Sequence, residues 1–293
     1  EGGIQRAMID WASVILANRP ESFGAITPEN RFSQWLVRNH PSAKTVRLSS
    51  LQRRIIRHLP WLSRYTLSGY QAKIAFVHNG FACTSAHYLA SQVIGVCHND
   101  KPHHFKGADY LICLTPGAIT LAKQQGWTDD RLIMLPHYYV CQHVNMPALP
   151  NAPSLRVSAA GRFVHKKNFG LFISIAAAVQ AKHPEIHFTL AGDGPLRASL
   201  RKMAADRGAR IDFIGWADMD KLASGTHLFI LPSKVEPFGY VLAEMMDAGT
   251  AVLSTPTSGA EYLLDGGKVA PLIEASQLER WVETILILAD DKE

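Results

Sequence analysis

One segment in the second half of the chain, residues 228–249, constrains the fold more than any other. Leu228–Leu231 is a short apolar run, typical of a strand buried on both faces of a parallel sheet. From Phe238 onward, apolar residues recur at helical spacing until Gly249 ends the pattern. The segment therefore predicts a strand, a loop and a helix, the repeating unit of an α/β sheet.

Two glutamates, Glu236 and Glu244, flank the start of this predicted helix, eight positions apart. The amides of Phe238, Gly239 and Tyr240 are the donors of a helix N-terminus, which together with the helix dipole favours an anion such as a diphosphate. The second carboxylate lies roughly 12 Å further along the helix. The pair could hold opposite ends of an elongated ligand, one a hexose and the other a ribose. The alternative is a capping glutamate followed by an ordinary solvated one.

A basic element lies upstream, between a predicted strand at 155–160 and a predicted helix at 169–181. Gly161 ends the strand, and Arg162 and Lys167 follow in the loop. In an open α/β sheet, ligands bind at the carboxyl ends of the strands. A guanidinium and an ammonium at that edge would suit a diphosphate. The alternative is a solvated basic loop without a ligand.

These elements, with others in the same order, resemble the donor-binding domain of retaining GT-B glycosyltransferases, the group-1 family with the E-x7-E signature. The resemblance covers residues 155–267 and departs from the family at Ala251, where proline is common. The matching pieces are Gly161–Arg162 with Lys167, Phe188–Pro195, Ile211–Gly215, Pro232–Ser233, Glu236–Glu244, Ala248–Thr250, Ser258–Glu261 and Asp265–Gly266.

The resemblance implies an α/β fold of GT-B type, with two Rossmann-like domains facing a cleft. The proline-rich stretch 144–153 reads as the linker, which predicts an acceptor domain at 1–145 and a donor domain at 146–293. The implied reaction moves a hexose from a UDP-, GDP- or ADP-sugar to a hydroxyl of a glycan or lipid-linked glycan, with retention of configuration. Polysaccharide or lipopolysaccharide synthesis is the implied setting, and no metal or other cofactor is expected.

The resemblance also assigns roles in the donor site. Arg162 and Lys167 would neutralise the diphosphate, Glu244 would hold the ribose, and Glu236 would face the transferred sugar. Retaining glycosidases that form a covalent intermediate need two carboxylates ~5 Å apart. The two glutamates here look too distant for that, which favours same-face attack guided by the leaving phosphate. Backbone contacts with the donor are expected from Gly215, Phe238, Gly239 and Tyr240.

The first half resembles the acceptor domain of the same family less specifically. Its predicted strands, at 71–78, 92–98, 108–115 and 131–136, suggest a parallel sheet. The start of the chain looks like the glycine-rich turn that follows a first strand, so that strand is expected to be absent from the sequence. The fourth member of the predicted catalytic set, besides Glu236, Arg162 and Lys167, is His98. The expected acceptor contacts are Gly3, Asn79 and Asn99.

The histidines in this half also have purely structural interpretations. His98 ends a predicted strand, as does His78, and a lone histidine is more often structural than catalytic. His103 and His104 together with His98 suggest a metal site, but no carboxylate or cysteine spacing supports one. We therefore expect no bound metal.

Charge is unevenly distributed, with a balance of +7 over residues 1–145 and −2 over residues 146–293. Much of the excess lies between Lys44 and Arg64, a window without acidic residues in which Leu51, Ile55, Leu59 and Leu62 recur near helical spacing. The pattern predicts an amphipathic helix whose basic flank, Arg47–Arg64, could bind an anionic membrane surface or an acidic acceptor. The alternative is an ordinary surface helix. No nucleic-acid-reading module accompanies it, so nucleic acid is not an expected partner.

Other signals limit location and class. No apolar run reaches ~18 residues and no signal peptide is visible, and the four cysteines form no C-x-x-C pair. A cytoplasmic protein is expected, at the inner face of the membrane if the basic segment binds lipid. Gly192 and Gly194 do not complete a dinucleotide motif, because Arg197 occupies the third glycine position. A nucleotide-sugar epimerase and a non-catalytic sugar-nucleotide-binding module remain open alternatives.

Overall fold

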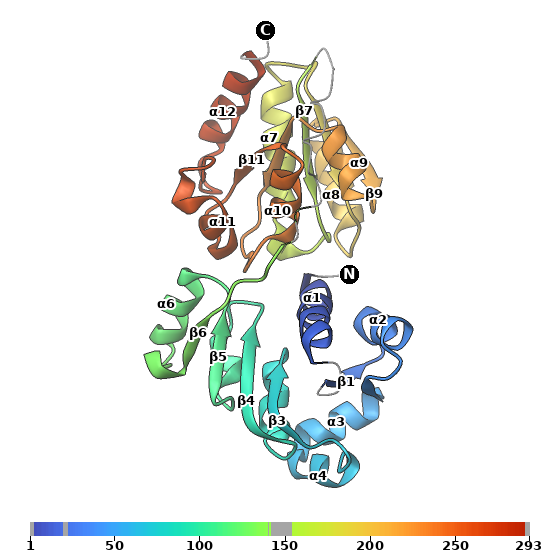
Figure 1. The fold of residues 1–293 in the computed structure, drawn as a ribbon. Coiled ribbons are helices and arrows are strands. Elements are labelled where there is room, and N and C mark those ends of the chain that lie inside the picture. Colours follow the sequence, from blue (N-terminus) through green and yellow to red (C-terminus); the bar gives the residue numbers. More distant parts are fainter. Residues whose placement is uncertain (1–2, 20–22, 140, 142–153, 291–293) are drawn as a thin grey trace. The chain divides into compact units, whose positions relative to one another are not determined.

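The computed structural model describes residues 3–19, 23–139, 141 and 154–290 (Figure 1). The chain divides into two compact units, Glu1–Tyr138 and Tyr139–Glu293. Each unit contains parallel strands alternating with helices, as the sequence predicted. The predicted linker at 144–153 lies wholly outside the described residues, and the boundary expected between residues 145 and 146 falls there too, so that division stays a prediction.

The second unit is built on a five-stranded parallel sheet of order β11-β10-β7-β8-β9. The chain runs outward from the central strand to one edge and then returns to the other side. Between β10 and β7 the direction of winding therefore reverses, and ligands bind beyond the carboxyl ends of the strands at such a point. The strands are β7 (Arg156–Ala160), β8 (His187–Ala191), β9 (Ile211–Gly215), β10 (Leu228–Leu231) and β11 (Ala251–Ser254).

Helices cover both faces of this sheet, and each face has its own apolar core (Figure 1). Phe172, Phe188 and Trp281 belong to the core under α7, α8 and α12. Leu231, Leu242 and others form the core under α9, α10 and α11. The elements are α7 (Phe169–Gln180), α8 (Arg197–Asp206), α9 (Met219–Ser224), α10 (Tyr240–Asp247), α11 (Ser258–Leu263), α12 (Leu278–Asp290), η6 (His165–Lys167) and η7 (Asp265–Gly267).

The first unit contains two separate parallel sheets. The four strands expected from the sequence form the larger one, of order β3-β4-β5-β6, while β1 and β2 pair only with each other. Within the described ranges, no helix is both long enough and apolar enough to cross a bilayer. The strands are β1 (Gly24–Pro28), β2 (Lys44–Leu48), β3 (Ala72–Val77), β4 (Ala90–Cys97), β5 (Tyr110–Cys113) and β6 (Leu132–Met134).

Two apolar clusters hold this unit together. Phe105, Leu111 and three free cysteines, Cys83, Cys97 and Cys113, pack in the core of the larger sheet. Leu36 and Phe32 anchor a smaller cluster between α1 and α2. The helices are α1 (Gly3–Asn18), α2 (Arg31–Asn39), α3 (Ser50–His58), α4 (Ser63–Thr66), α5 (Cys83–Ala86) and α6 (Pro116–Gln124), with short turns η2 (Pro60–Leu62), η3 (Gly80–Ala82), η4 (Pro102–Phe105) and η5 (Asp129–Arg131).

The helix predicted across the basic segment is confirmed only over α3 (Ser50–His58), and its extension to either side is wrong. Lys44 and Arg47 belong to β2, and α3 ends before Pro60, which cannot continue a helix. No residue of α3 is buried. The Arg57 guanidinium lies 4.2 Å from the centre of the Phe81 ring, which joins α3 to η3. We call the result the arginine surface: exposed Leu51, Ile55, Leu59, Trp61, Tyr65 and Phe81 together with exposed Arg53, Arg54, Arg57 and Arg64.

Close packing of two loops accounts for both glycines of the Gly192–Gly194 turn. The Phe163 amide donates to the Asp193 carbonyl over 2.8 Å, which brings the loops after β7 and β8 together. A Cβ at position 192 would lie 1.9 Å from the carbonyl oxygen of Gly161. At position 194 it would lie 2.7 Å from that of Phe163. These glycines serve loop packing, in agreement with the rejection of a dinucleotide motif.

We expect Gly192→Ala to lower the free energy of unfolding of the second unit by about 3 kcal/mol, from steric overlap together with backbone strain. Gly208→Ala is the matched control, because Gly208 also has positive φ (67°) but nothing within 4 Å of its added Cβ. That variant should lose only about 1 kcal/mol. Urea unfolding of both variants measures the difference, and equal losses would contradict the packing argument.

Candidate functional site

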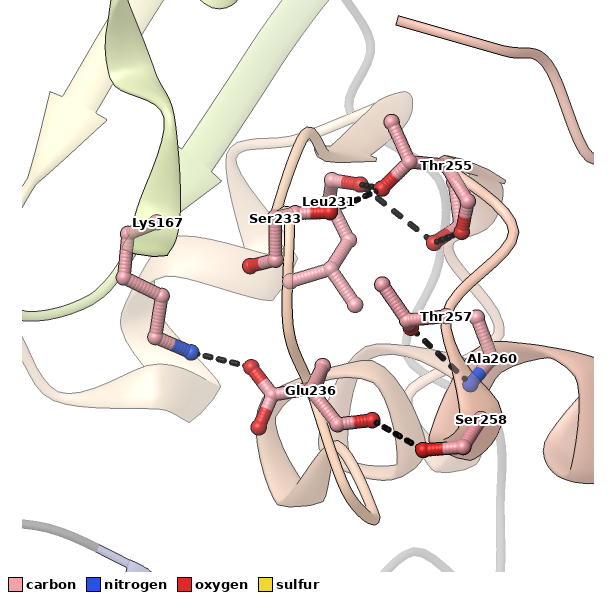
Figure 2. Close-up of polar contacts among 9 residues, drawn as sticks. Lys167, Leu231, Ser233, Glu236, Thr255, Thr257, Ser258 and Ala260 are labelled. Carbon is pink, nitrogen blue, oxygen red and sulfur yellow. Dashed lines mark hydrogen bonds and ion pairs between the residues drawn. The ribbon is translucent and has the colours of Figure 1, made fainter. Parts of the chain in front are cut away.

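The loop from β10 to α10 is held in place by the segment that leads into α11 (Figure 2). The Thr255 hydroxyl donates to the Ser233 carbonyl over 2.5 Å. Further along, the Gly259 amide donates to the Glu236 carbonyl over 2.8 Å, and the Ser258 hydroxyl donates to the same oxygen over 3.4 Å. The backbone that carries Glu236 is therefore fixed by several hydrogen bonds, independently of its side chain.

The Glu236 carboxylate is paired with Lys167 (Figure 2). The Lys167 ammonium donates to Glu236 Oε2, and the two side chains are only 14% and 15% exposed. The loops also touch through their backbones, since the Lys234 amide donates to the Lys166 carbonyl over 2.8 Å. The two elements that the sequence placed at one sheet edge thus meet there, although 69 positions separate their side chains in the chain.

Arg162 lies in the same loop as Lys167 but is exposed. Within the described part of the chain, no hydrogen bond or ion pair engages its guanidinium. Gly161 precedes it with φ of 149°, a backbone conformation that suits glycine at the end of β7. One expected cation is therefore held by a carboxylate, while the other extends into solvent; their joint action on a diphosphate stays a prediction.

α10 begins at Tyr240, two residues after the predicted start at Phe238, and anion binding at this end stays a prediction. Its N-cap is Gly239, with φ of 91° and no capping side chain. The first-turn amides of the helix point toward this end, beginning at Tyr240. Phe238 is buried, at 5% exposure. Glu244 lies one turn further along α10 and is half-buried.

Ser233 is a residue to which sequence reasoning assigned no role. It is completely buried, and within the described ranges its hydroxyl has no hydrogen-bond partner. Leaving a buried hydroxyl unsatisfied costs about 1–3 kcal/mol, so a ligand that bonded to it would recover free energy. The signal in the sequence was its place directly after a buried strand, at the edge where ligands bind.

Gly215 ends β9 at the same edge of the sheet, two strands away from β7. Its φ is 75°, and its carbonyl accepts from the Gly192 amide over 2.6 Å. The apolar side chains on either side are unusually exposed, Ile214 by 49% and Trp216 by 61%. Exposed apolar side chains of this kind can pack against an aromatic ring, whereas the backbone contact expected of Gly215 stays a prediction.

In the first unit, three histidines form a hydrogen-bonded chain. His78 Nδ1 lies 2.7 Å from His98 Nε2, and His98 Nδ1 lies 3.0 Å from His137 Nε2. Both pairs of rings are stacked, with centroids 5.0 Å apart. Trp11 packs edge-on against the outer two. His78 and His98 follow neighbouring strands, as predicted; His137 was missed, although it directly follows a predicted strand that ends in proline.

The histidine chain is neutral at ordinary pH. Burial lowers the pKa of His78 and of His137 to about 4. Burial, followed by the neighbouring rings of His78 and His137, holds the pKa of His98 well below its usual range. Burial is the largest cause for all three rings, so it opposes protonation of each of them.

The side chains of the expected acceptor residues Asn79 and Asn99 make local turn contacts and are not members of the histidine chain. Asn79 Oδ1 accepts from the Phe81 amide over 3.3 Å, and Asn99 Oδ1 accepts from the Lys101 amide over 3.2 Å. Both side chains therefore cap local turns, although both are exposed. Gly3 is the first residue of α1. Their contact with an acceptor stays a prediction.

The histidines proposed and rejected as metal ligands lie on η4. The His103 amide donates to Gln125 Oε1 over 2.9 Å, and the His103 and His104 rings stand edge to face. Within the part of the chain that the structure describes, no group of three or more His, Cys, Asp or Glu side chains could hold a metal ion.

Comparison with solved structures identifies the fold. The chain superposes on the lipopolysaccharide outer core galactosyltransferase WaaB with a TM-score of 0.78, covering 99% of this chain and 87% of that one at 14% identity. Against Anabaena Alr3699/HepE in complex with UDP and glucose, the TM-score is 0.73, with 97% and 86% covered at 17% identity. The fold is therefore that of the GT-B glycosyltransferases.

The sequence comparisons name the family. Residues 150–293, most of the second unit, match the family model described as glycosyl transferases group 1. The lipopolysaccharide core biosynthesis glycosyltransferase LpsE of Rhizobium meliloti is 27% identical over 197 residues, 64% of this chain. The chain spans little more than half of that relative, 56% of its length.

Acidification should destabilise the first unit through the histidine chain. Because these pKa values are lower in the folded state, the unfolded chain takes up protons first as the pH falls below 6.5. The stability is complete above about pH 6.5 and is lost progressively toward pH 4, by about 3 kcal/mol for each of His78 and His137. Urea unfolding followed between pH 7 and pH 4.5 measures it.

His137→Gln should flatten this pH dependence, since it removes one titrating ring. His58→Gln provides the control, because His58 is an exposed histidine of the same unit and should leave the slope unchanged. The explanation fails if both variants keep the slope of the parent protein.

Proposed function

We propose that this protein transfers a hexose from a nucleoside-diphosphate sugar to a hydroxyl acceptor, with retention of the anomeric configuration. The observation that carries the proposal is the Lys167–Glu236 pair, which lies beyond the reversal point of the sheet in a unit of the glycosyl transferases group 1. Ligand binding at that place follows from the architecture of open α/β sheets.

The diphosphate would bind between the basic loop and the start of α10. An ammonium has three protons, so Lys167 can keep its bond to Glu236 and still donate to a phosphate oxygen. Arg162 is exposed and can swing its guanidinium onto a second oxygen. The first-turn amides of α10 and the buried Ser233 hydroxyl would add hydrogen-bond donors, and the α10 dipole would add a favourable field. Together these groups would stabilise the charge that develops on the leaving diphosphate.

The ion pair also bears on stereochemistry. A carboxylate that accepts a hydrogen bond from an ammonium is a poorer nucleophile, and Glu236 accepts such a bond. We therefore favour same-face attack over a covalent glycosyl-enzyme: the sugar–phosphate C–O bond breaks, the acceptor oxygen bonds to the same face, and its proton goes to the departing phosphate. Glu236 would orient a sugar hydroxyl through its other oxygen, and Glu244 would hold the ribose.

The base would rest against the exposed apolar surface at the end of β9. Ile214 and Trp216 supply that surface, and the open backbone of Gly215 lies between them. Stacking on an aromatic ring tolerates any base, so these residues do not select among UDP, GDP and ADP. HepE, with UDP and glucose in its solved complex, makes UDP-sugars the first donors to test.

The acceptor is proposed to be a glycan, in free or lipid-linked form, of polysaccharide or lipopolysaccharide synthesis. The relative LpsE acts in lipopolysaccharide core biosynthesis, which motivates this choice. The arginine surface adds a physical reason to place the enzyme at an anionic membrane face. Residues 30–99 contain no acidic residue, and four exposed arginines beside six exposed apolar side chains match an anionic lipid interface.

Lys167→Ala should lower turnover by 10²-fold to 10³-fold, the usual cost of removing one well-placed charge donor. The assay is UDP release from UDP-glucose in the presence of a glycan acceptor extract. The neighbouring Lys166→Ala serves as the control, since Lys166 is exposed and outside the ion pair. Turnover at the parent rate in Lys167→Ala, with a folded protein by circular dichroism, would refute the assigned role.

Sedimentation with lipid vesicles tests the membrane proposal. The protein should bind phosphatidylglycerol vesicles and not phosphatidylcholine vesicles, and raised salt should release it. Leu51→Ser combined with Arg54→Glu should weaken binding about tenfold, whereas Val269→Ser, an exposed apolar site in the other unit, should not. Equal binding to phosphatidylglycerol and phosphatidylcholine vesicles, or unchanged binding of the double variant, would overturn the proposal.

A further inference from the structure

His98 has no ring nitrogen left for a substrate. Its Nε2 is engaged with His78 and its Nδ1 with His137, at 2.7 and 3.0 Å. A neutral imidazole offers one N–H and one lone pair, and both are used in these two bonds. A contact between the His98 ring and a bound sugar would therefore require one of them to break.

The two hydrogen bonds also couple the tautomers of the three rings. If His98 donates from Nδ1 to His137, it must accept at Nε2 from the Nδ1–H of His78. His78 then carries a lone pair on Nε2. In the reverse arrangement His98 donates to His78, which must hold its own proton on Nε2. The chain thus has two states, in which His78 Nε2 is either an acceptor or a donor.

His78 is the member of the chain that a ligand can reach. His98 and His137 are 8% and 6% exposed, whereas His78 is half-buried at the carboxyl end of β3. Its Nε2 atom bonds to no other described residue and is not among the buried polar atoms that lack a partner, so it remains open to solvent. A neutral ring of low pKa suits a hydroxyl better than a phosphate.

We propose that His78, through Nε2, hydrogen-bonds a sugar hydroxyl of the substrate, and that His98 and His137 are positioning residues that fix whether His78 donates or accepts. The inference rests on the proposed function, because that function supplies the sugar. It assigns to His78, the neighbour of His98 in the histidine chain, the role that the sequence analysis expected of His98.

Nitrogen-15 NMR of histidine-labelled protein at pH 7 tests the coupling without substrate. The three rings should be neutral and should share one tautomer, all Nδ1–H or all Nε2–H. In His98→Leu, the signals of His78 should shift toward the tautomer mixture of a solvated imidazole. Different tautomers in the parent protein, or an unchanged His78 in the variant, would overturn the positioning role.

Turnover of UDP-glucose with the acceptor extract tests the contact. His78→Leu should lower kcat/KM about tenfold, the worth of one good hydrogen bond. His78→Gln should restore most of it, because a carboxamide can both donate and accept. His187→Leu, an exposed histidine of the other unit, is the control. If His78→Leu is folded and turns over like the parent, or if His78→Gln is no better than His78→Leu, the contact is refuted.

Failure of this inference and failure of the proposed function give different results. A thermal-shift titration with UDP-glucose reports donor binding through Lys167 and α10, with no requirement for His78. Binding to the parent and to His78→Leu alike, with full turnover in the variant, would leave the proposed function standing and remove His78 from it. A parent protein that neither binds nor turns over UDP-, GDP- or ADP-sugars would remove the function, whatever the tautomers show.

Discussion

The ion pair between Lys167 and Glu236 is the contact on which the second unit's site depends. It joins the loop after β7 to the loop after β10, the two strands between which the winding of the sheet reverses. Both side chains are largely withdrawn from water, and a partly buried charge is tolerated only when it is compensated. Each side chain therefore fixes the other, and the ammonium is held at the edge of the sheet where the winding reverses.

Much of this unit could be predicted because buried parallel strands read as plain apolar runs. Leu228–Leu231 and the segment Arg156–Ala160 were placed correctly, and so were the helices that follow them. The Lys167–Glu236 contact itself could not be read from periodicity, since it joins residues far apart in the chain. Ser233 was overlooked for another reason: an unsatisfied buried hydroxyl exists only in three dimensions.

The first unit was harder to predict, because its elements are short and partly polar. β1 and β2 have five residues each, and neither sequence alternates clearly between polar and apolar. In the basic segment, leucine and isoleucine at helical spacing were interpreted as one helix. Pro60 interrupts that helix, and the residues before position 49 pair as a strand. His137 entered the histidine chain through the fold alone, across 39 positions from His98. The roles of the site residues in binding and catalysis were predicted and stay untested.

The way the β10–α10 loop is anchored has a consequence for how such a site can diversify. Its fixed points are backbone carbonyls, of Ser233 and Glu236, held by the segment around Gly259. Lys234 and Val235, between those points, are exposed and contribute no side chain to the anchoring. Their identities can change during evolution, or be chosen by an engineer, while the loop keeps its course, so new side-chain chemistry can arise there without rebuilding the scaffold beneath.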